Sequence, residues 1–345
     1  MCGIEIKNQE FSLPLDENRS SYKIEDQKYG MNPHLHQFSD IPIQDMNILN
    51  FLRFEKYYCQ IDPLFQKLLR EKITNFSAIA KKINTSRETI ARITKINDYW
   101  MNIETLLQLS EKLGIKKEKV FLNIKYIKTK NSFSLLFNIK NLVSPSFFRI
   151  LGHILGDGGI HVIEKEKKYR AFYVNNQKEL LDSFNEDVKT IFGNIKLYSR
   201  ERELHGDEIW LPTTVGYILY NIFEYERLNK KKRVPSFVLE TKDKKLLGAF
   251  LQALYDDEGY LYPQKNMIVI AQKSKELVEE IRKVVLSVGI RPNQLLIHKS
   301  KKRTTMYYFS ITHKDNIRLF DQYIGFKHPL KKKKLAILID KYGGK

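Results

Sequence analysis

Two nine-residue segments of this chain, Ile150–Gly158 (ILGHILGDG) and Leu251–Gly259 (LQALYDDEG), share one pattern. Each is mostly apolar, with a small residue in third place, a carboxylate in eighth place and a glycine in ninth place. An apolar run that stops at a glycine predicts a buried helix. The carboxylates, Asp157 and Glu258, then fall in the last turn, where the helix dipole disfavours an acid by about 0.3–1 kcal/mol. An acid in an unfavourable place, present twice, indicates a task such as holding a cation.

The two segments belong to a longer internal repeat. Each is followed by a strand-like run and a helix, then by a hairpin, a short helix and a cluster of lysines. The lysine clusters are 230–232 and 331–334, and matching features lie about 100 residues apart. A duplication of this kind predicts two similar halves, 144–241 and 242–345, packed about a pseudo-two-fold axis.

The charge of the chain favours an acidic partner. Lys and Arg number 59 against 40 Asp and Glu, a formal net charge of +19 over 345 residues. This balance favours nucleic acid, although a basic surface kept for solubility is the alternative. Two cysteines, Cys2 and Cys59, predict neither a disulfide framework nor a zinc site, which fits a cytoplasmic setting. No apolar run approaches the roughly 18 residues of a membrane span, and the charged N-terminus is unlike a signal peptide.

The part of the chain before the repeats divides into three segments. Residues 1–50 are polar and weakly periodic, and they predict no particular structure. Residues 51–122 predict consecutive helices, and therefore an all-α domain. Residues 123–143, rich in Lys, Asn and Phe, predict a connector with some strand.

Both motif helices are apolar nearly all round, so we expect them to be buried. Gly152 and Gly156 are four residues apart and would let two helix backbones approach closely. If the helices pack in parallel about the pseudo-dyad, Asp157 and Glu258 lie side by side. Two close carboxylates repel each other unless a proton or a cation intervenes, and Mg²⁺ (or Mn²⁺) is the natural counter-ion for oxygen ligands. For either segment alone, the alternative is an ordinary core helix with an acid in its last turn.

The two segments resemble the paired LAGLIDADG motifs of homing endonucleases, in the form that carries both motifs in one chain. The resemblance covers about 144–340. It implies an α+β fold of two pseudo-symmetric αββαββα repeats with antiparallel DNA-binding saddles, in which the motif helices form the central interface. It also implies that Asp157 and Glu258 are catalytic and bind metal. His153 and Gln252 depart from the apolar motif, and we expect each to face a sheet edge or solvent.

Members of this family place a lysine of each repeat beside the acids, where a positive charge can orient the attacking water. The segment that begins at Lys232 (KRVPSF) resembles the Lys-x-Ile-Pro-x-Phe pattern of the family, which makes Lys232 the first candidate. In the second repeat, Ile-Gly-Phe at 324–326 followed by Lys331 resembles a matching pattern. Lys331 to Lys334 are consecutive, however, so the register stays open there, and a solvated basic run is the alternative for both.

The hairpins expected at 196–212 and 295–312 are rich in long polar side chains. Side chains alternate between the faces of a ribbon, so one face can pack on helices while the other meets DNA. A β-ribbon fits the major groove, where Arg and Lys read guanine, and the resemblance implies the same use. The candidate DNA-binding residues are Arg200, Arg202, Lys299, Lys301 and Arg303. For any one of them, a solvated sheet face is the alternative.

A second pattern lies in 64–115. Residues 76–83 predict a short amphipathic helix, and 87–93 predict another, with a capping box from Thr85 to Glu88 between them. This pattern resembles a helix-turn-helix of the phage-repressor type, whose second helix enters the major groove. The residues expected to face the DNA are Arg87, Thr89 and Arg92. A generic helical hairpin is the alternative.

Together these features predict a DNA endonuclease of the homing type that cuts both strands of double-stranded DNA at a long, specific site. We expect a monomer, because one chain carries both motifs. The alternatives are a non-catalytic DNA-binding transcriptional regulator on the same scaffold and an RNA maturase. Asp157 and Glu258 favour the enzyme, and a helix-turn-helix would be superfluous for RNA. A self-splicing intein is less favoured, since Met1 precedes Cys2 and the chain ends without a His-Asn pair.

Overall fold

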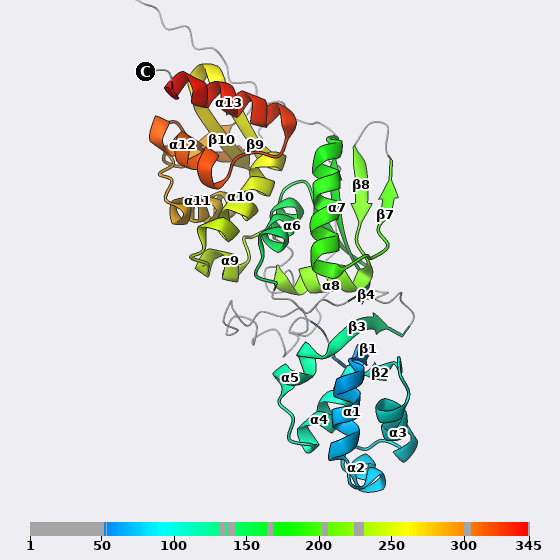
Figure 1. Ribbon diagram of the computed structural model, residues 1–345. Coiled ribbons are helices and arrows are strands. Elements are labelled where there is room, and N and C mark those ends of the chain that lie inside the picture. The colour runs from blue at the N-terminus through cyan, green and yellow to red at the C-terminus, as the bar shows by residue number, and fades with distance from the viewer. Residues whose placement is uncertain are drawn as a thin grey trace, which may run out of the picture. The chain divides into compact units, whose positions relative to one another are not determined.

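The computed structural model describes residues 52, 54–130, 135–136, 142–163, 168–201, 206–223, 231–299 and 305–343 (Figure 1). Residues 1–50, for which the sequence predicts no structure, lie outside these ranges. In the part that is described, no helix is both long and apolar enough to cross a membrane.

The segment that precedes the repeats is mixed α and β, so the expected all-α domain is wrong in this respect. Four antiparallel strands form a sheet in the order β2-β1-β3-β4. The strands are β1 (Tyr57–Ile61), β2 (Met101–Asn102), β3 (Ile124–Thr129) and β4 (Leu135–Leu136). The first two fall among helices, where short runs are hard to recognise. Burial alternates along β1, with Tyr57, Cys59 and Ile61 inward, as a half-buried strand requires.

Five helices accompany this sheet: α1 (Pro63–Lys72), α2 (Phe76–Lys82), α3 (Arg87–Lys95), α4 (Ile103–Lys112) and α5 (Lys117–Leu122), with a 3₁₀ turn, η4 (Phe54–Lys56), before β1. Polar side chains accept main-chain N–H groups at the start of the first four helices, which satisfies donors that have no partner within the helix. These caps are Asp62, Asn75, Ser86 and Asn102. The cap of α3 is therefore Ser86, one residue later than the capping box expected at Thr85.

Two αββαββα repeats follow, as the sequence predicts. The first consists of α6 (Pro145–Leu155), β5 (Gly159–Ile163), β6 (Lys168–Asn175), α7 (Lys178–Phe192), β7 (Tyr198–Arg200), β8 (Asp207–Trp210) and α8 (Thr213–Ile222). The second consists of α10 (Lys244–Glu258), β9 (Gly259–Tyr262), β10 (Met267–Gln272), α11 (Lys275–Val288), β11 (Leu296–Lys299), β12 (Thr305–Ile311) and α12 (Lys314–Tyr323). A short helix, α9 (Ser236–Glu240), lies between them, η6 (Pro263–Lys265) connects β9 to β10, and α13 (Pro329–Gly343) comes last.

The two repeat sheets have the same topology. Both are antiparallel, in the orders β5-β6-β8-β7 and β9-β10-β12-β11. On β6, at the centre of the first-repeat sheet, Ala171 and Tyr173 are fully buried on one side of the strand. In the second repeat Ile268 and Ile270 on β10 have the same role. The equal order of strands is the structural form of the duplication that the sequence indicates.

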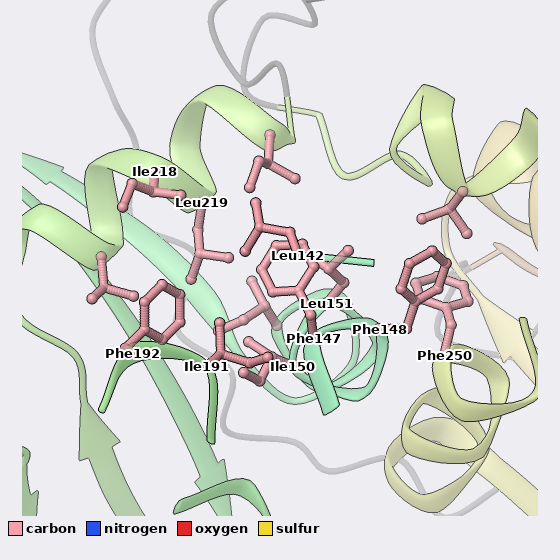
Figure 2. Packing of buried hydrophobic residues seen from close by; sticks show 14 of the residues in the cluster. Leu142, Phe147, Phe148, Ile150, Leu151, Ile191, Phe192, Ile218, Leu219 and Phe250 are labelled. Carbon is pink, nitrogen blue, oxygen red and sulfur yellow. The ribbon is translucent and has the colours of Figure 1, made fainter. Parts of the chain in front are cut away.

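The motif helices α6 and α10 pack directly on each other. A Cβ placed on Gly152 would overlap the main-chain oxygen of Phe250 and lie only 2.8 Å from the Cβ of Ala253, so this position of α6 has room only for glycine. Phe148 of α6 and Phe250 of α10 are fully buried, and Figure 2 shows them turned toward each other. Burying one such side chain contributes about 1.5–3 kcal/mol. Phe147, on a neighbouring side of α6, extends toward α8, which carries Leu219 (Figure 2). The helix is thus buried on both of these sides, as its apolar sequence predicts.

Candidate functional site

The two motif helices end against each other. Helix α10 runs to Glu258, as expected, but α6 ends at Leu155, so Asp157 lies two residues beyond the helix rather than in its last turn. The chain leaves the helix at Gly156, whose ψ is −112°. A Cβ at Gly156 would lie 2.6 Å from Oδ2 of Asp257, so the side chain of Asp257 fills the space beside this glycine.

Asp157 makes hydrogen bonds through its main chain and through its carboxylate. Its main-chain nitrogen lies 3.4 Å from Oδ2 of Asp257, and its Oδ2 accepts a hydrogen bond from Nδ2 of Asn175 at 3.3 Å. Asp257 is the residue before Glu258. The C-terminal ends of the two motif segments, which carry Asp157 and Glu258, are therefore in contact.

The two candidate lysines have equivalent places at these helix ends. Nζ of Lys232 donates to the main-chain oxygens of Leu155, Gly156 and Gly158, each at 3.0 Å. Nζ of Lys331 donates to the main-chain oxygens of Tyr255 and Asp256, at 3.0 and 2.5 Å. Carbonyls at a helix C-terminus have no partner within the helix, and a cation there is favourable to the dipole. Each lysine thereby offsets the negative charge that the motif acids add to their helix ends.

The structure also separates Lys331 from its three neighbours. Lys332, Lys333 and Lys334 are exposed, whereas Lys331 is partly buried and reaches α10. Burial is the largest influence on the pKa of Lys331 and lowers it, while nearby carboxylates raise it. These carboxylates are Asp256, Asp257, Asp157 and Glu258. The ammonium group of Lys331 therefore lies within electrostatic reach of both motif acids.

Helix α10 carries two further acids that were not predicted as site residues from the sequence. Asp256 is buried, and its carboxylate accepts the main-chain N–H groups of Lys327 and His328 at 3.0–3.1 Å. Burial raises the pKa of Asp256 to about 6, against the lowering effect of these hydrogen bonds. The other acid is Asp257. The sequence signal for these two acids was the run of three consecutive acids at the end of an apolar helix. Only the third acid, Glu258, occupies the position that Asp157 has in the first motif.

His153 lies in the interface between the repeats rather than at a sheet edge or in solvent. Its side chain is 1% exposed, and Nδ1 lies 3.1 Å from Oδ2 of Asp257, whose side chain is 0% exposed. A carboxylate only accepts, so Nδ1 must carry the proton of this hydrogen bond. Tyr173 donates from its hydroxyl to Oδ1 of Asp257 at 2.8 Å. Burial first, then the charge of Asp257, raises the pKa of Tyr173, so the phenol stays protonated.

The other polar motif residue, Gln252, also has a protein partner. Its Nε2 donates to the main-chain oxygen of Ile324 at 2.8 Å, and the residue is half-buried. Both polar departures from the motif pattern therefore make specific contacts, which corrects the expectation that they face a sheet edge or solvent.

The chemistry of the site suits a hard divalent cation. Over the described ranges, no three His, Cys, Asp or Glu side chains converge as a ready-made metal cage. Mg²⁺ commonly takes only one or two protein carboxylates and completes its shell with water and phosphate oxygens. Asp157 and Glu258, one from each repeat, are two such carboxylates, and both would offer oxygen ligands.

The sheet of the first repeat has a cationic and aromatic outer face. Tyr198 is paired with Trp210, which is paired with Phe172, and the Trp210 and Phe172 ring centroids lie 4.9 Å apart. Alternation places Arg200 on the same face, where it pairs with the buried Glu208, and Arg170, two residues before Phe172, lies on this face as well. Both arginines are exposed. Arg202 lies outside the described residues.

In the second repeat the strand register gives Lys299 a different place. Lys299 pairs with Thr305, and Thr305 alternates with Tyr307 and the fully buried Phe309. Lys299 is exposed, but it shares its strand side with residues that face the helices. Lys301 and Arg303 lie outside the described residues.

The candidate residues before the repeats lie on α3. Ile90 and Ile93 are fully buried, whereas Arg87 and Arg92 are exposed, and the side chain of Arg92 pairs with Glu88. Thr89 is half-buried, and its main-chain N–H donates to Oγ of Ser86 at 3.0 Å. A turn that includes Asn84, with φ of 49°, joins α2 to α3.

Several curated proteins are similar in sequence to this chain. It is 24% identical over 303 residues to the isomerizing glutamine–fructose-6-phosphate aminotransferase of Methanocaldococcus jannaschii, across 85% of this chain and 27% of that protein. It is 25% identical over 190 residues to the replication factor C small subunit of the same organism, across 55% and 10%. It is 24% identical over 205 residues to the replicative DNA helicase DnaB of Synechocystis, across 53% and 22%. The chain thus spans between 10% and 27% of these relatives.

Solved structures and one family model are similar as well. The homing endonuclease I-DmoI in complex with DNA and Ca aligns with a TM-score of 0.42 and 20% identity, over 57% of this chain and 99% of that chain. The homing endonuclease I-WcaI bound to its DNA recognition sequence aligns with a TM-score of 0.37 and 21% identity, over 56% and 87%. The second repeat, at residues 245–325, matches the family model of a LAGLIDADG-like domain, and the first repeat has the same αββαββα order of elements.

Proposed function

We propose that this chain is a metal-dependent DNA endonuclease of the homing type, which cuts both strands of double-stranded DNA at one long site. The observation that carries the proposal is the meeting of the two motif helices at their C-terminal ends. There the main-chain nitrogen of Asp157 contacts Asp257, the residue before Glu258, and a lysine, Lys232 or Lys331, lies at each helix end, which supports a shared role for the two motif acids.

In this proposal the two acids hold the cation and the two lysines keep the acids in place. Mg²⁺ (or Mn²⁺), when bound, supplies an activated water and stabilises negative charge at the phosphate. Lys232 uses its three N–H donors on three carbonyls, so its part is to fix the chain around Asp157 and to add positive charge there. Lys331 does the same at the end of α10 and balances four surrounding carboxylates.

The outer face of the first-repeat sheet supplies a surface for the DNA. Arg200 and Arg170 offer charge for phosphates or base edges, and Tyr198, which is 66% exposed, offers a flat aromatic surface. We propose further DNA contacts from Arg202, Lys299, Lys301 and Arg303 around the two hairpins. On the exposed side of α3, Arg87, Thr89 and Arg92 are proposed to read or grip a flanking part of the site.

The curated relatives support the proposal that this segment moves between genes. Their names describe an aminotransferase, a replication factor subunit and a helicase, which share no activity, and the matched part is between 10% and 27% of each. A segment shared by such different proteins is typical of a module that moves between genes, as a homing endonuclease does.

The test uses the purified protein, Mg²⁺ and a supercoiled plasmid that carries the DNA flanking its own gene. We expect one discrete linear product, and none when EDTA is present. The exposed acid Asp182 provides the control, since Asp182→Asn removes a carboxylate from α7 without touching the motif helices. Binding without cutting of any tested DNA, under Mg²⁺ and Mn²⁺ alike, would favour the non-catalytic regulator instead.

A further inference from the structure

Asp157 is part of a closed ring of hydrogen bonds that crosses between the repeats. Its main-chain N–H donates to Oδ2 of Asp257 at 3.4 Å, and Oδ1 of Asp257 accepts the hydroxyl of Tyr173 at 2.8 Å. The oxygen of Tyr173 accepts from Nδ2 of Asn175 at 3.1 Å, and the same amide donates to Oδ2 of Asp157 at 3.3 Å. An amide has two N–H donors, so Asn175 can make both bonds at once.

Asp157 and Asn175 are half-buried, and the ring is braced on its inner side, at Tyr173 and Asp257. Tyr173 is fully buried, and its ring packs against His153 at 4.6 Å and against Phe184 at 4.8 Å between centroids. His153 holds both oxygens of Asp257 from α6, at 3.1 and 3.2 Å. Oδ1 of Asn175 accepts the main-chain N–H of Gln177 at 2.9 Å, which fixes the amide at the start of α7. Groups braced in this way have little freedom to reorient.

Two members of the ring, Asp257 and Tyr173, have no polar counterparts around Glu258, although the same register pairs Asn175 with Gln272. The caps Gln177 of α7 and Ser274 of α11 mark equivalent places, and counting back four residues from each pairs Tyr173 with Ile270. The motifs themselves pair His153 with Leu254 and Asp257 with Gly156. The side chains of Leu254 and Ile270 have no hydrogen-bonding group, and glycine has no side chain at all. The ring is therefore a feature of one half of a molecule that is otherwise built as a repeat.

We propose that Asp257, Tyr173 and Asn175 are positioning residues that fix Asp157 across the repeat interface, and that the cutting of one DNA strand depends on them more than the cutting of the other. This inference rests on the proposed endonuclease function. In a DNA duplex, an approximate two-fold axis relates the two scissile phosphates. The two repeats are related to each other in the same way. Each repeat acid therefore serves mainly one strand, and a device that orients only Asp157 acts mainly on one cut.

The first measurement needs neither DNA nor metal. Tyr173→Phe removes the hydroxyl of the ring and keeps the packed aromatic body. Tyr255→Phe is the matched control, because the hydroxyl of this equally buried tyrosine has no hydrogen-bond partner in the described structure. We expect the amide proton of Asp157, followed by NMR in the metal-free protein, to exchange about fivefold faster in Tyr173→Phe and at the wild-type rate in Tyr255→Phe. Equal exchange in all three proteins would overturn the ring as a restraint on Asp157.

The second measurement resolves the two strands. With a target labelled differently on each strand, we expect Tyr173→Phe to slow one cut about tenfold relative to the other, so that nicked circles accumulate from a supercoiled plasmid. Asn175→Ala, which opens the ring at another point, should slow the same strand, while DNA affinity stays at the wild-type value. Equal slowing of both strands, or opposite strand preferences of the two variants, would overturn the inference.

The two measurements separate this inference from the function on which it rests. If the wild type cuts neither strand, the proposed endonuclease function fails, and the amide exchange still decides whether the ring restrains Asp157. If the wild type cuts and Tyr173→Phe keeps the wild-type strand ratio, the function stands and the positioning role is wrong.

Discussion

His153 and Asp257 form a buried contact between the two repeats, with Nδ1 of the imidazole 3.1 Å from Oδ2 of the carboxylate and both side chains at most 1% exposed. Asp257→Ala leaves the N–H of this ring without its acceptor, so we expect the free energy of unfolding to fall by about 3 kcal/mol. The double variant His153→Leu with Asp257→Ala removes both polar groups and should recover at least half of that loss. Urea unfolding of the two single variants and the double variant measures the coupling, and purely additive effects would contradict a direct interaction.

The close approach of α6 and α10 makes Gly152 sensitive to a single added methyl group. Gly152→Ala would place a Cβ against the main-chain oxygen of Phe250 and 2.8 Å from Cβ of Ala253. We expect the free energy of unfolding to fall by about 1–3 kcal/mol, because the helices must move apart. Adding Ala253→Gly should restore only part of the loss, since the main-chain oxygen of Phe250 remains. A variant as stable as the wild type would show that the helices are not packed this tightly.

Burial of Cys59 predicts an unreactive thiol. Cys59 is fully buried on β1, and burial raises its pKa far above the ordinary value. The native thiol should resist Ellman's reagent at pH 8 and react fully in urea, with Cys2→Ser used so that Cys59 alone is measured. The unfolded thiol ionises above about pH 8.5 and the folded one does not, so this group favours unfolding increasingly as the pH rises past that value. Rapid reaction in the native state would contradict the burial of β1.

The exposed arginines of α3 predict a salt-dependent contribution to DNA binding. Replacing Arg87 and Arg92 by alanine should weaken binding and reduce the slope of log Kd against log salt by about two. Arg70→Ala, an exposed arginine at the end of α1, is the control and should change neither quantity as much. An unchanged slope in the double variant would remove α3 from the DNA-binding surface.

The sequence predicted the repeats well because their signals are periodic and doubled. Apolar runs that end in glycine located α6 and α10, and the same order of strands in both copies followed from the matching features. A doubled pattern is informative because the elements predicted in one copy can be checked against those predicted in the other. The short strands β1 and β2 occur once and had no such second copy, and an all-α domain was expected in their place.

The part of the site that the sequence did not predict depends on contacts between the halves. His153 looked like a misplaced polar residue, and Asp257 looked like a neighbour of the motif acid, because their partners lie across the interface. Only the packing of α6 on α10 shows that each is the other's partner. Similarly, four consecutive lysines are equivalent in sequence, and the rotation of α13 at its start is what turns Lys331 alone toward α10.

Asp157 and Glu258 are proposed to act together as one metal-dependent site. Binding and cutting of the same DNA by the wild type, Asp157→Asn and Glu258→Gln test this joint action. We predict that each variant binds DNA within about threefold of the wild-type Kd in low salt and cuts at least about 100-fold more slowly in Mg²⁺. If either variant cuts both strands at the wild-type rate, the meeting ends of α6 and α10 are not the active site.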